Sequence, residues 1–511
     1  MHLITKKTLI LSGFILAKFL LQYFLVNPHY DLQRDEYLHL DQANHLAWGY
    51  LSVPPVTSWF SLIIRLLGNS VFWIKFFPAL FGALTMVIVW KTIEELKGNL
   101  YALILGATCM LLSVLLRINL LFQPNSMDIL CWTALYFSVI KYFSQEKPKW
   151  LYIAAIVFAF GFLNKYNIVF LVIGLLPALL ITDQRKVFLN KHLYLSILLS
   201  CLLISPNLYW QYKNGFPVFH HLAELTATQL IHVSRWLFLK EQIFYFIGAL
   251  PVIIASLYAV LFHESLKRFR FFFWSMIFTL ATFTYFRAKG YYAIGIYPIY
   301  ISIGAVFLGD VLQNSWKIYL RPVLLAIPII FYLLLFHVFF TVESPDEIGE
   351  KKDTYQKLGL LRWEDGKDHQ LPQDFADMLS WHELGTKVET IYNSLPKGTQ
   401  TLILCDNYGQ AGAINYYVRN KNIRAVSFNA DYINWFNLEK KTDNFIRVKD
   451  FIGSNDEFKK TSPFFRKSFV ADSIDNPLAR EYGTKIFVFM NPVIDVNQRL
   501  KAEIEKEKRQ R

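Results

Sequence analysis

Apolar runs close to 20 residues long recur between residues 8 and 340 of this 511-residue chain, and short polar links separate them. A helix of about 20 apolar residues can cross a bilayer, so the pattern predicts a polytopic α-helical membrane protein. Single spans are predicted at residues 8–26, 71–90, 100–116, 127–143, 193–210, 240–262, 270–287, 291–309 and 319–340.

One apolar stretch, residues 151–182, is too long for an ordinary span and is interrupted by polar residues around Lys165. Basic residues flank it on both sides, and such residues favour the cytoplasm. The stretch is therefore predicted to be a hairpin of two short helices with Lys165 at its tip. With this hairpin counted as two, the chain has about 11 membrane segments.

The charge distribution orients these segments. Basic residues concentrate in the loops at 91–98, 183–192 and 263–270, which are therefore predicted to be cytoplasmic. Lys6 and Lys7 place the N-terminus on the same side. A cleaved signal peptide is the alternative, but the first run is long for one and no small-residue cleavage site follows it. A multi-pass protein of the inner (plasma) membrane is predicted.

The net charge of +13 could also indicate nucleic-acid binding. However, no basic stretch alternates with stacking aromatic residues in a soluble segment. Lysine and arginine in cytoplasmic loops and near lipid phosphates explain the excess. The membrane is therefore a predicted partner, and nucleic acid is not.

Residues 27–70 follow the first span and are amphipathic but too polar to cross a membrane. Residues 39–50 have the apolar spacing of a helix, and Pro54 and Pro55 suit the first turn of another. We predict helices that lie on the membrane surface. This segment is the first outer loop of a transmembrane domain at residues 1–340.

Residues 341–511 differ in character, because charge rises and apolar runs shorten to the length of strands. They are predicted to form a small α/β domain on the outer side of the membrane. The predicted elements are strands at 401–405, 424–428 and 485–490, a helix at 411–418, and a charged helix or tail at 499–511. The scattered cysteines predict neither a disulfide framework nor a metal site.

Two adjacent carboxylates, Asp35 and Glu36, begin the first outer loop. A carboxylate at a membrane surface can act as a general base on an acceptor hydroxyl or amine. The alternative is a solvated pair of loop charges. Asp128 begins a predicted span, where an ionisable residue is a functional candidate; a helix N-cap is its alternative.

Cations form the second set of candidates. Lys165 is costly to leave unpaired in a membrane, so it is expected to line a cavity or to pair with a carboxylate such as Asp128. Arg287 and Lys289 lie beside a glycine between two spans and suit a phosphate.

Two tyrosines, Tyr291 and Tyr292, follow these cations and suit a sugar or a lipid head group. The alternative for the whole segment is a belt of interfacial anchors. His220 and His221 lack a third ligand at metal spacing, so no metal site is predicted.

Short motifs occur in these segments over nearly the whole chain. They are RDEY at 34–37, HLAWGY at 45–50 with prolines at 54–55, LNKY at 163–166, PNLYWQ at 206–211, AKGYY at 288–292 with YP at 297–298, and NYGQAGA at 407–413. In this order and spacing they resemble GT-C glycosyltransferases of the dolichyl-phosphate-mannose-protein mannosyltransferase type. The bacterial branch that includes the lipid A aminoarabinose transferase is the most similar.

This resemblance implies a hexosyl- or pentosyltransferase that takes a sugar from a polyprenyl-phosphate donor and passes it to an envelope acceptor (lipid A, a glycan or a protein) at the outer face of the membrane. It implies no cofactor and no metal. Ser52 departs from the pattern, because relatives commonly carry an aspartate at this point of the Gly-Tyr-x-Asp-x-Pro-Pro run; any role of that acid is absent or moved here.

The resemblance also implies roles for individual residues. It implies that Asp35, with Glu36 as its alternative, activates the acceptor and that Asp128 is a second acid near the site. The remaining implied roles are donor-phosphate binding by Lys289, Arg287 and Lys165, and substrate binding by Tyr37, Tyr291 and Tyr292.

Two other functional classes are compatible with these residues. A transporter or flippase of lipid-linked sugars would also use a broken hairpin with a buried lysine, but it predicts pseudo-repeated halves, which the sequence does not show. A non-catalytic membrane anchor for the C-terminal domain would leave the cost of Lys165 unexplained.

Overall fold

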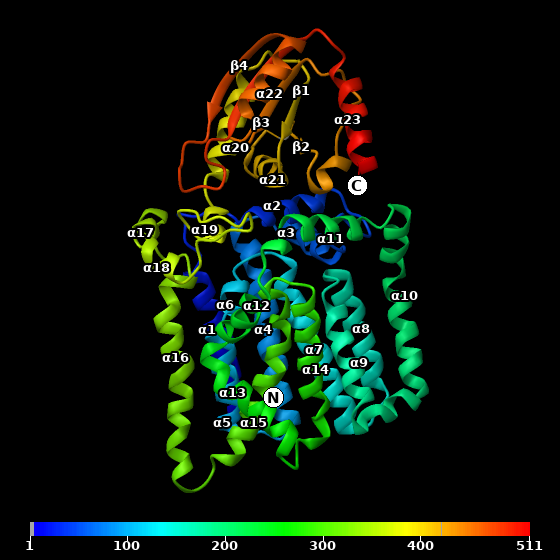
Figure 1. The fold of residues 1–511 in the computed structure, drawn as a ribbon, viewed down its shortest axis with the longest axis vertical. Helices are drawn as coiled ribbons and strands as arrows, with labels where there is room; N and C mark the ends of the chain where they lie inside the picture. Colours follow the sequence, from blue (N-terminus) through cyan, green and yellow to red (C-terminus); the bar gives the residue numbers. More distant parts are fainter. Residues whose placement is uncertain (1–4, 421, 511) are drawn as a thin grey trace.

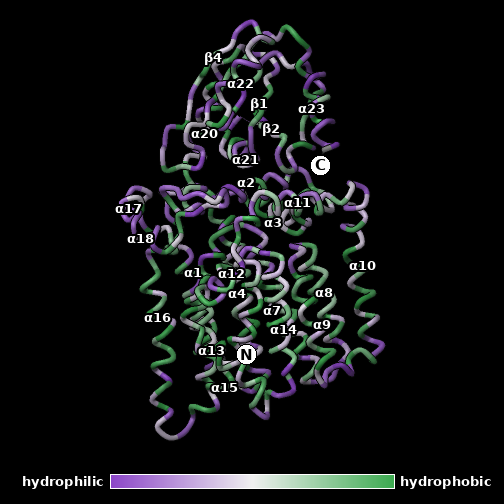
Figure 2. Tube along the Cα trace, in the orientation of Figure 1, coloured by the Kyte–Doolittle hydropathy of each residue, from purple (hydrophilic) through white to green (hydrophobic). Residues whose placement is uncertain are grey.

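The computed structural model describes residues 5–420 and 422–510. Figure 1 shows a bundle of long helices, a layer of short helices across one end of it, and a small sheet domain beyond that layer. Figure 2 shows that the bundle is mostly hydrophobic, whereas the sheet domain and the connecting segments carry more hydrophilic residues.

The bundle places a helix in every segment predicted to span. Its helices are α1 (Lys6–Phe24), α4 (Val71–Glu95), α5 (Leu100–Leu111), α7 (Pro124–Gln145), α8 (Lys149–Asn164), α9 (Ile168–Leu180), α10 (Lys191–Lys213), α12 (Arg235–Tyr245), α13 (Leu250–Phe262), α14 (Phe271–Tyr285), α15 (Tyr297–Val311) and α16 (Leu320–Phe339). Five helices of the described chain are long and apolar enough to cross a membrane, or seven if each bent pair forms one span. The protein is a multi-pass membrane protein, and the count of 11 segments stays a prediction.

The predicted hairpin at residues 151–182 is confirmed. Helix α8 ends at Asn164 and helix α9 begins at Ile168. Between them, Lys165 adopts an extended backbone with φ −156° and ψ 129°. The break therefore falls at the predicted polar interruption and projects Lys165 from the tip.

Short helices form the layer across the bundle, and α2, α3 and α11 lie nearly perpendicular to the long helices (Figure 1). The layer includes α2 (Arg34–Asp41), α3 (Val56–Leu66), α6 (Leu115–Ile118), α11 (Pro217–Thr228), α17 (Pro345–Glu350), α18 (Lys352–Lys357) and α19 (Gln373–Ala376).

The helix predicted at residues 39–50 is wrong in its bounds. Helix α2 starts earlier because Gln33 and Glu36 form a capping box at its N-terminus. Helical structure ends at Asn44. Beyond Asn44, the Tyr50 hydroxyl donates to the backbone carbonyl of His45 at 3.1 Å. This hydrogen bond holds the chain in a turn.

The sheet domain contains β1 (Thr401–Cys405), β2 (Ala425–Ser427), β3 (Asn444–Lys449), β4 (Phe465–Ser473) and β5 (Lys485–Pro492), in the order β2-β1-β3-β5-β4. Strand β1 is parallel to β2 and β3, and β5 is antiparallel to β3 and β4. The accompanying helices are α20 (Trp381–Ser394), α21 (Tyr408–Tyr417), α22 (Ser454–Thr461) and α23 (Val496–Gln510). The predicted small C-terminal α/β domain is confirmed, including its strands near 401, 425 and 485.

Helix α21 connects the sheet domain to the layer of short helices. It follows the carboxyl end of β1, and the Asn407 side chain caps its N-terminus. Figure 1 shows α21 directly above α2. The sheet domain therefore lies against the helix that carries the two adjacent carboxylates.

Candidate active site

Asp35 lies in the first turn of α2, and its side chain is partly exposed. Each carboxylate oxygen accepts one hydrogen bond: Oδ1 from the Tyr408 hydroxyl at 2.6 Å, and Oδ2 from the Gln123 amide at 3.3 Å. A carboxylate has about four acceptor positions. Each oxygen of Asp35 therefore keeps capacity for a further proton donor.

Glu36 is fully buried and lies in a different environment. Its Oε1 accepts from Lys75 Nζ at 2.8 Å and from the backbone N–H of Phe122 at 2.7 Å. Its Oε2 accepts from Lys75 Nζ at 2.7 Å and from the backbone N–H of Gln33 at 2.8 Å. These bonds use all the acceptor positions of the carboxylate. Glu36 connects α2 to α4 and to the segment before α7.

A chain of polar side chains connects Asp35 to Lys165. Gln123 donates to Asp35, and its own carbonyl accepts from Asn125 Nδ2 at 2.9 Å. Lys165 Nζ donates to Asn125 Oδ1 at 2.8 Å. The structure thus brings together two predicted residues from the first loop and the hairpin tip. The two amides that join them lie at the start of α7, and no sequence motif indicated them.

Asp128 lies one turn further along α7 and is buried. Its carboxylate accepts from the Trp132 indole at 2.9 Å and from the Asn167 amide at 3.1 Å. The same Asn167 amide donates to the backbone carbonyl of Tyr292 at 2.8 Å. Asp128 therefore does not cap α7. It holds the hairpin tip against the turn that follows α14.

The ammonium of Lys165 also faces two aromatic rings of this turn. It lies 4.5 Å from the ring centre of Tyr292 and 5.3 Å from that of Tyr291, which are cation–π distances. Both tyrosines are half-buried. The predicted residues Lys165, Tyr291 and Tyr292 are therefore neighbours.

Lys289 forms an ion pair with Glu364, which lies between α18 and α19. Gln373 also donates to Glu364 at 3.1 Å. Burial alone would raise the pKa of the Glu364 carboxyl, but the Lys289 ammonium and the Gln373 hydrogen bond together lower it below its usual value. Arg287 is exposed at the edge of the same turn.

The predicted cations and the predicted base lie within electrostatic reach of each other. The charge of Lys289 interacts with Asp35, and also with Lys165. A carboxylate and two cations from three separate segments thus converge at the layer of short helices. This arrangement suits a reaction in which a proton is removed while negative charge develops on a phosphate nearby.

Tyr37 lies away from this convergence. It is fully buried, and its ring contacts the rings of Trp381, Tyr416 and Tyr417 at 5.8 Å. Its hydroxyl donates to the Tyr417 hydroxyl at 3.1 Å. In this structure Tyr37 contributes to the contact with the sheet domain and has no surface that a substrate could touch.

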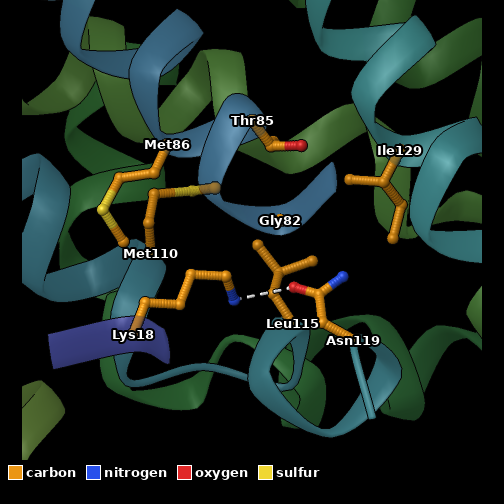
Figure 3. A pocket seen from close by; sticks show the side chains of 8 residues that line it. All are labelled: Lys18, Gly82, Thr85, Met86, Met110, Leu115, Asn119 and Ile129. Carbon is orange, nitrogen blue, oxygen red and sulfur yellow. Dashed lines mark hydrogen bonds between the residues drawn. The ribbon is translucent and has the colours of Figure 1, made fainter. Parts of the chain in front are cut away.

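A buried lysine in α1 belongs to none of the motifs found in the sequence. Lys18 is 2% exposed, and Figure 3 shows its Nζ pointing to Asn119 Oδ1 at 2.9 Å. The signal in the sequence is a lysine in the middle of an apolar run. Gln22 donates to the Asn119 carbonyl at 2.6 Å. Because Asn119 lies four residues before Gln123, we interpret this cluster as a support for the segment that contacts Asp35.

Metal-ligating groups are a separate question. Within residues 5–420 and 422–510, no group of three or more histidine, cysteine, aspartate or glutamate side chains is arranged to hold a metal ion. The independence from metals implied by the family resemblance stays a prediction.

A helical membrane bundle, surface helices that carry a carboxylate near cations, and a small sheet domain define the architecture. Residues 52–210 match the family model described as "Dolichyl-phosphate-mannose-protein mannosyltransferase". The resemblance to GT-C glycosyltransferases of this type is thereby confirmed for that segment. No curated protein sequence matches the chain significantly.

The fold is that of ArnT from Cupriavidus metallidurans. The crystal structure of ArnT bound to undecaprenyl phosphate is 12% identical, with a TM-score of 0.61, and the match covers 93% of this chain and 97% of that chain. The apo structure of ArnT is 14% identical, with the same TM-score and coverage. At these identities the similarity shows a shared fold over nearly the full length of both chains.

Proposed function

We propose that this protein is a membrane glycosyltransferase that transfers a sugar from a polyprenyl-phosphate donor to an envelope acceptor. The observation that carries the proposal is the partly exposed Asp35, which has unused acceptor capacity and lies within electrostatic reach of Lys289. The family match supports it, as does the shared fold with ArnT, which was crystallised with undecaprenyl phosphate.

The reaction is a displacement at the anomeric carbon of the donor sugar. Asp35 takes the proton of an acceptor hydroxyl or amine, and the freed electron pair attacks the anomeric carbon. The bond between that carbon and the phosphate oxygen breaks, and polyprenyl phosphate leaves with the electron pair. A single displacement inverts the configuration at the anomeric carbon.

The cations are proposed to stabilise the donor phosphate. Charge develops on the phosphate as the bond breaks, and fixed positive groups in a partly buried site stabilise it. Lys289 is assigned to the donor phosphate, and Lys165 and Arg287 are secondary candidates. Asp128 acts through Asn167 on the shape of the site, and Glu36 acts through the position of α2. This mechanism uses no cofactor.

Transfer in detergent separates an enzyme from a flippase. Purified protein, a polyprenyl-phosphate sugar and total envelope lipids are mixed in micelles, where no closed membrane exists. We expect acceptor lipids to gain the mass of a hexose or pentose, because chemistry needs no second compartment. Mass spectrometry of envelope lipids from a deletion strain then names the sugar and the acceptor. Flipping in vesicles without transfer in micelles would instead support the transporter class.

Action at the outer face requires that the sheet domain lie outside the cell, with the N-terminus in the cytoplasm. Glu350 in α17 is exposed near the sheet domain, and Arg185 is exposed between α9 and α10. In a background without the exposed Cys201, we expect Glu350→Cys to react with an impermeant thiol reagent in intact cells. Arg185→Cys is expected to react only after lysis. The reverse pattern would invert the proposed topology.

A further inference from the structure

We propose that Tyr408, which belongs to the C-terminal sheet domain, is a positioning residue for Asp35. The active site is then complete only when this domain is docked on α2. The inference rests on the proposed function, in which Asp35 is the base. It assigns the sheet domain a part in the chemistry, although every site residue predicted from the sequence lies before residue 293.

The contact between the two residues is close and doubly constrained. The Tyr408 hydroxyl donates to Asp35 Oδ1 at 2.6 Å. The Tyr408 ring lies against the guanidinium of Arg34, with 4.3 Å from the guanidinium carbon to the ring centre. Because Arg34 immediately precedes Asp35, the tyrosine contacts both the side chain of Asp35 and its neighbour on α2. A hydrogen bond to an ionised carboxylate is among the stronger ones in proteins.

The docking of α21 on α2 fixes the position of Tyr408. An added Cβ at Gly409 would lie 2.6 Å from Arg34 Cγ, and one at Gly412 would lie 2.7 Å from Tyr37 Cβ. Only glycine allows so close an approach of the two helices at these positions. Glycine at these two positions thus lets α21 lie on α2 along the turns that carry Arg34 and Tyr37.

The opposite end of the contact is held by hydrogen bonds. Asn415 and Tyr432 both donate to Asp41 Oδ2, each at 2.8 Å. Asp41 is the last residue of α2, two turns from Asp35. The sheet domain therefore contacts α2 at both of its ends, at Asp35 and at Asp41. These contacts limit the movement of Asp35.

The sheet holds the first turn of α21 from the other side. Asn407 caps the helix by accepting from the backbone N–H of Gln410 at 3.0 Å. Gln410 in turn donates to Glu481 at 2.6 Å and accepts from the backbone N–H of Asp406 at 2.9 Å. Tyr408 thus lies in a turn that the Asn407 cap and the Gln410 contacts fix to the sheet domain, and its hydroxyl points to Asp35.

A purely structural role is the alternative. In that case the hydroxyl would only help to dock the two domains, and its loss would lower stability without a selective effect on turnover. A positioning role predicts instead that the orientation of the Asp35 carboxylate toward the acceptor worsens. This loss appears in kcat, while the affinity for donor and acceptor is unchanged.

Tyr408→Phe tests the inference, because it removes the hydroxyl and keeps the ring on Arg34. We expect kcat to fall by about 10- to 100-fold, the effect of losing one hydrogen bond to a charged group. KM for both substrates is expected to stay within about twofold, since neither binds the hydroxyl. The melting temperature is measured on the same samples.

Tyr416→Phe is the matched control. It makes the same change on the same helix and removes another bond to the membrane domain, from its hydroxyl to the Asn69 carbonyl at 3.1 Å. It should turn over at the wild-type rate. Equal losses of activity and melting temperature in both variants would overturn the positioning role in favour of docking alone.

The outcomes also separate this inference from the proposed function. Wild-type kcat in Tyr408→Phe, with Asp35→Asn inactive, would overturn the inference and leave the function standing. A wild-type protein that transfers no sugar in micelles to envelope lipids, glycans or proteins would overturn the function, and the inference with it.

Discussion

Replacing Asp35 by asparagine is expected to lower the rate of sugar transfer by about 10²- to 10⁴-fold, the usual effect of losing a general base. Asparagine has the same shape, and its Oδ1 can still accept from the Tyr408 hydroxyl, but it cannot take a proton from the acceptor. The folded protein should remain, because Asp35 is partly exposed and makes no ion pair in the described chain. Transfer in membranes and the melting temperature measure the two effects separately.

The adjacent carboxylate provides the matched control, with the opposite expectation. Glu36→Gln leaves Lys75 without its anion in a site where the Glu36 side chain is fully buried. Removing one partner of a buried ion pair costs about 3–5 kcal/mol of stability. The variant should therefore melt early or fail to accumulate. Normal transfer by Asp35→Asn, or wild-type stability of Glu36→Gln, would contradict the division of roles between the two acids.

The parts of the fold that depend on local pattern were predictable. Hydropathy predicts the positions of the long helices, and the basic flanks of residues 151–182 predict a hairpin without any tertiary contact. The strands near 401 and 485 were recognisable as short apolar runs in a charged region. Each of these signals lies within about 20 residues of sequence, the length of the element that it specifies.

The division of roles between Asp35 and Glu36 was not predictable. In the sequence they are equivalent neighbours on one helix. They differ because Lys75 reaches only Glu36 from α4, and because Tyr408, 373 residues away along the chain, reaches only Asp35. Such contacts arise from tertiary packing, which no local pattern encodes.

The start of α2 differs from the prediction for a more local reason. A capping box at Gln33 and Glu36 is present in the sequence, but glutamine is not among the preferred N-cap residues. The apolar spacing of residues 39–50 therefore predicts a helix that begins later in the sequence.

Lys289→Ala is expected to raise the KM for the polyprenyl-phosphate donor by about 10- to 100-fold, because a charge-assisted hydrogen bond to a phosphate is worth about 1.5–3 kcal/mol. The KM for the acceptor should change much less, since the acceptor meets Asp35 rather than Lys289. Steady-state kinetics with each substrate varied in turn measures both values. Equal changes for donor and acceptor would contradict a phosphate-binding role.

Glu364→Gln is expected to change the donor KM in the opposite direction to Lys289→Ala. Glu364 pairs with Lys289 in the structure, so a donor phosphate must compete with a carboxylate for the same ammonium. Glutamine keeps the size of the side chain and a carbonyl oxygen for the Gln373 amide, but it removes the competing charge. A partly exposed ion pair contributes about 0.2–1 kcal/mol, so the donor KM should fall by up to about fivefold. If Glu364→Gln raised the donor KM as Lys289→Ala does, the glutamate would be part of the donor site rather than its competitor.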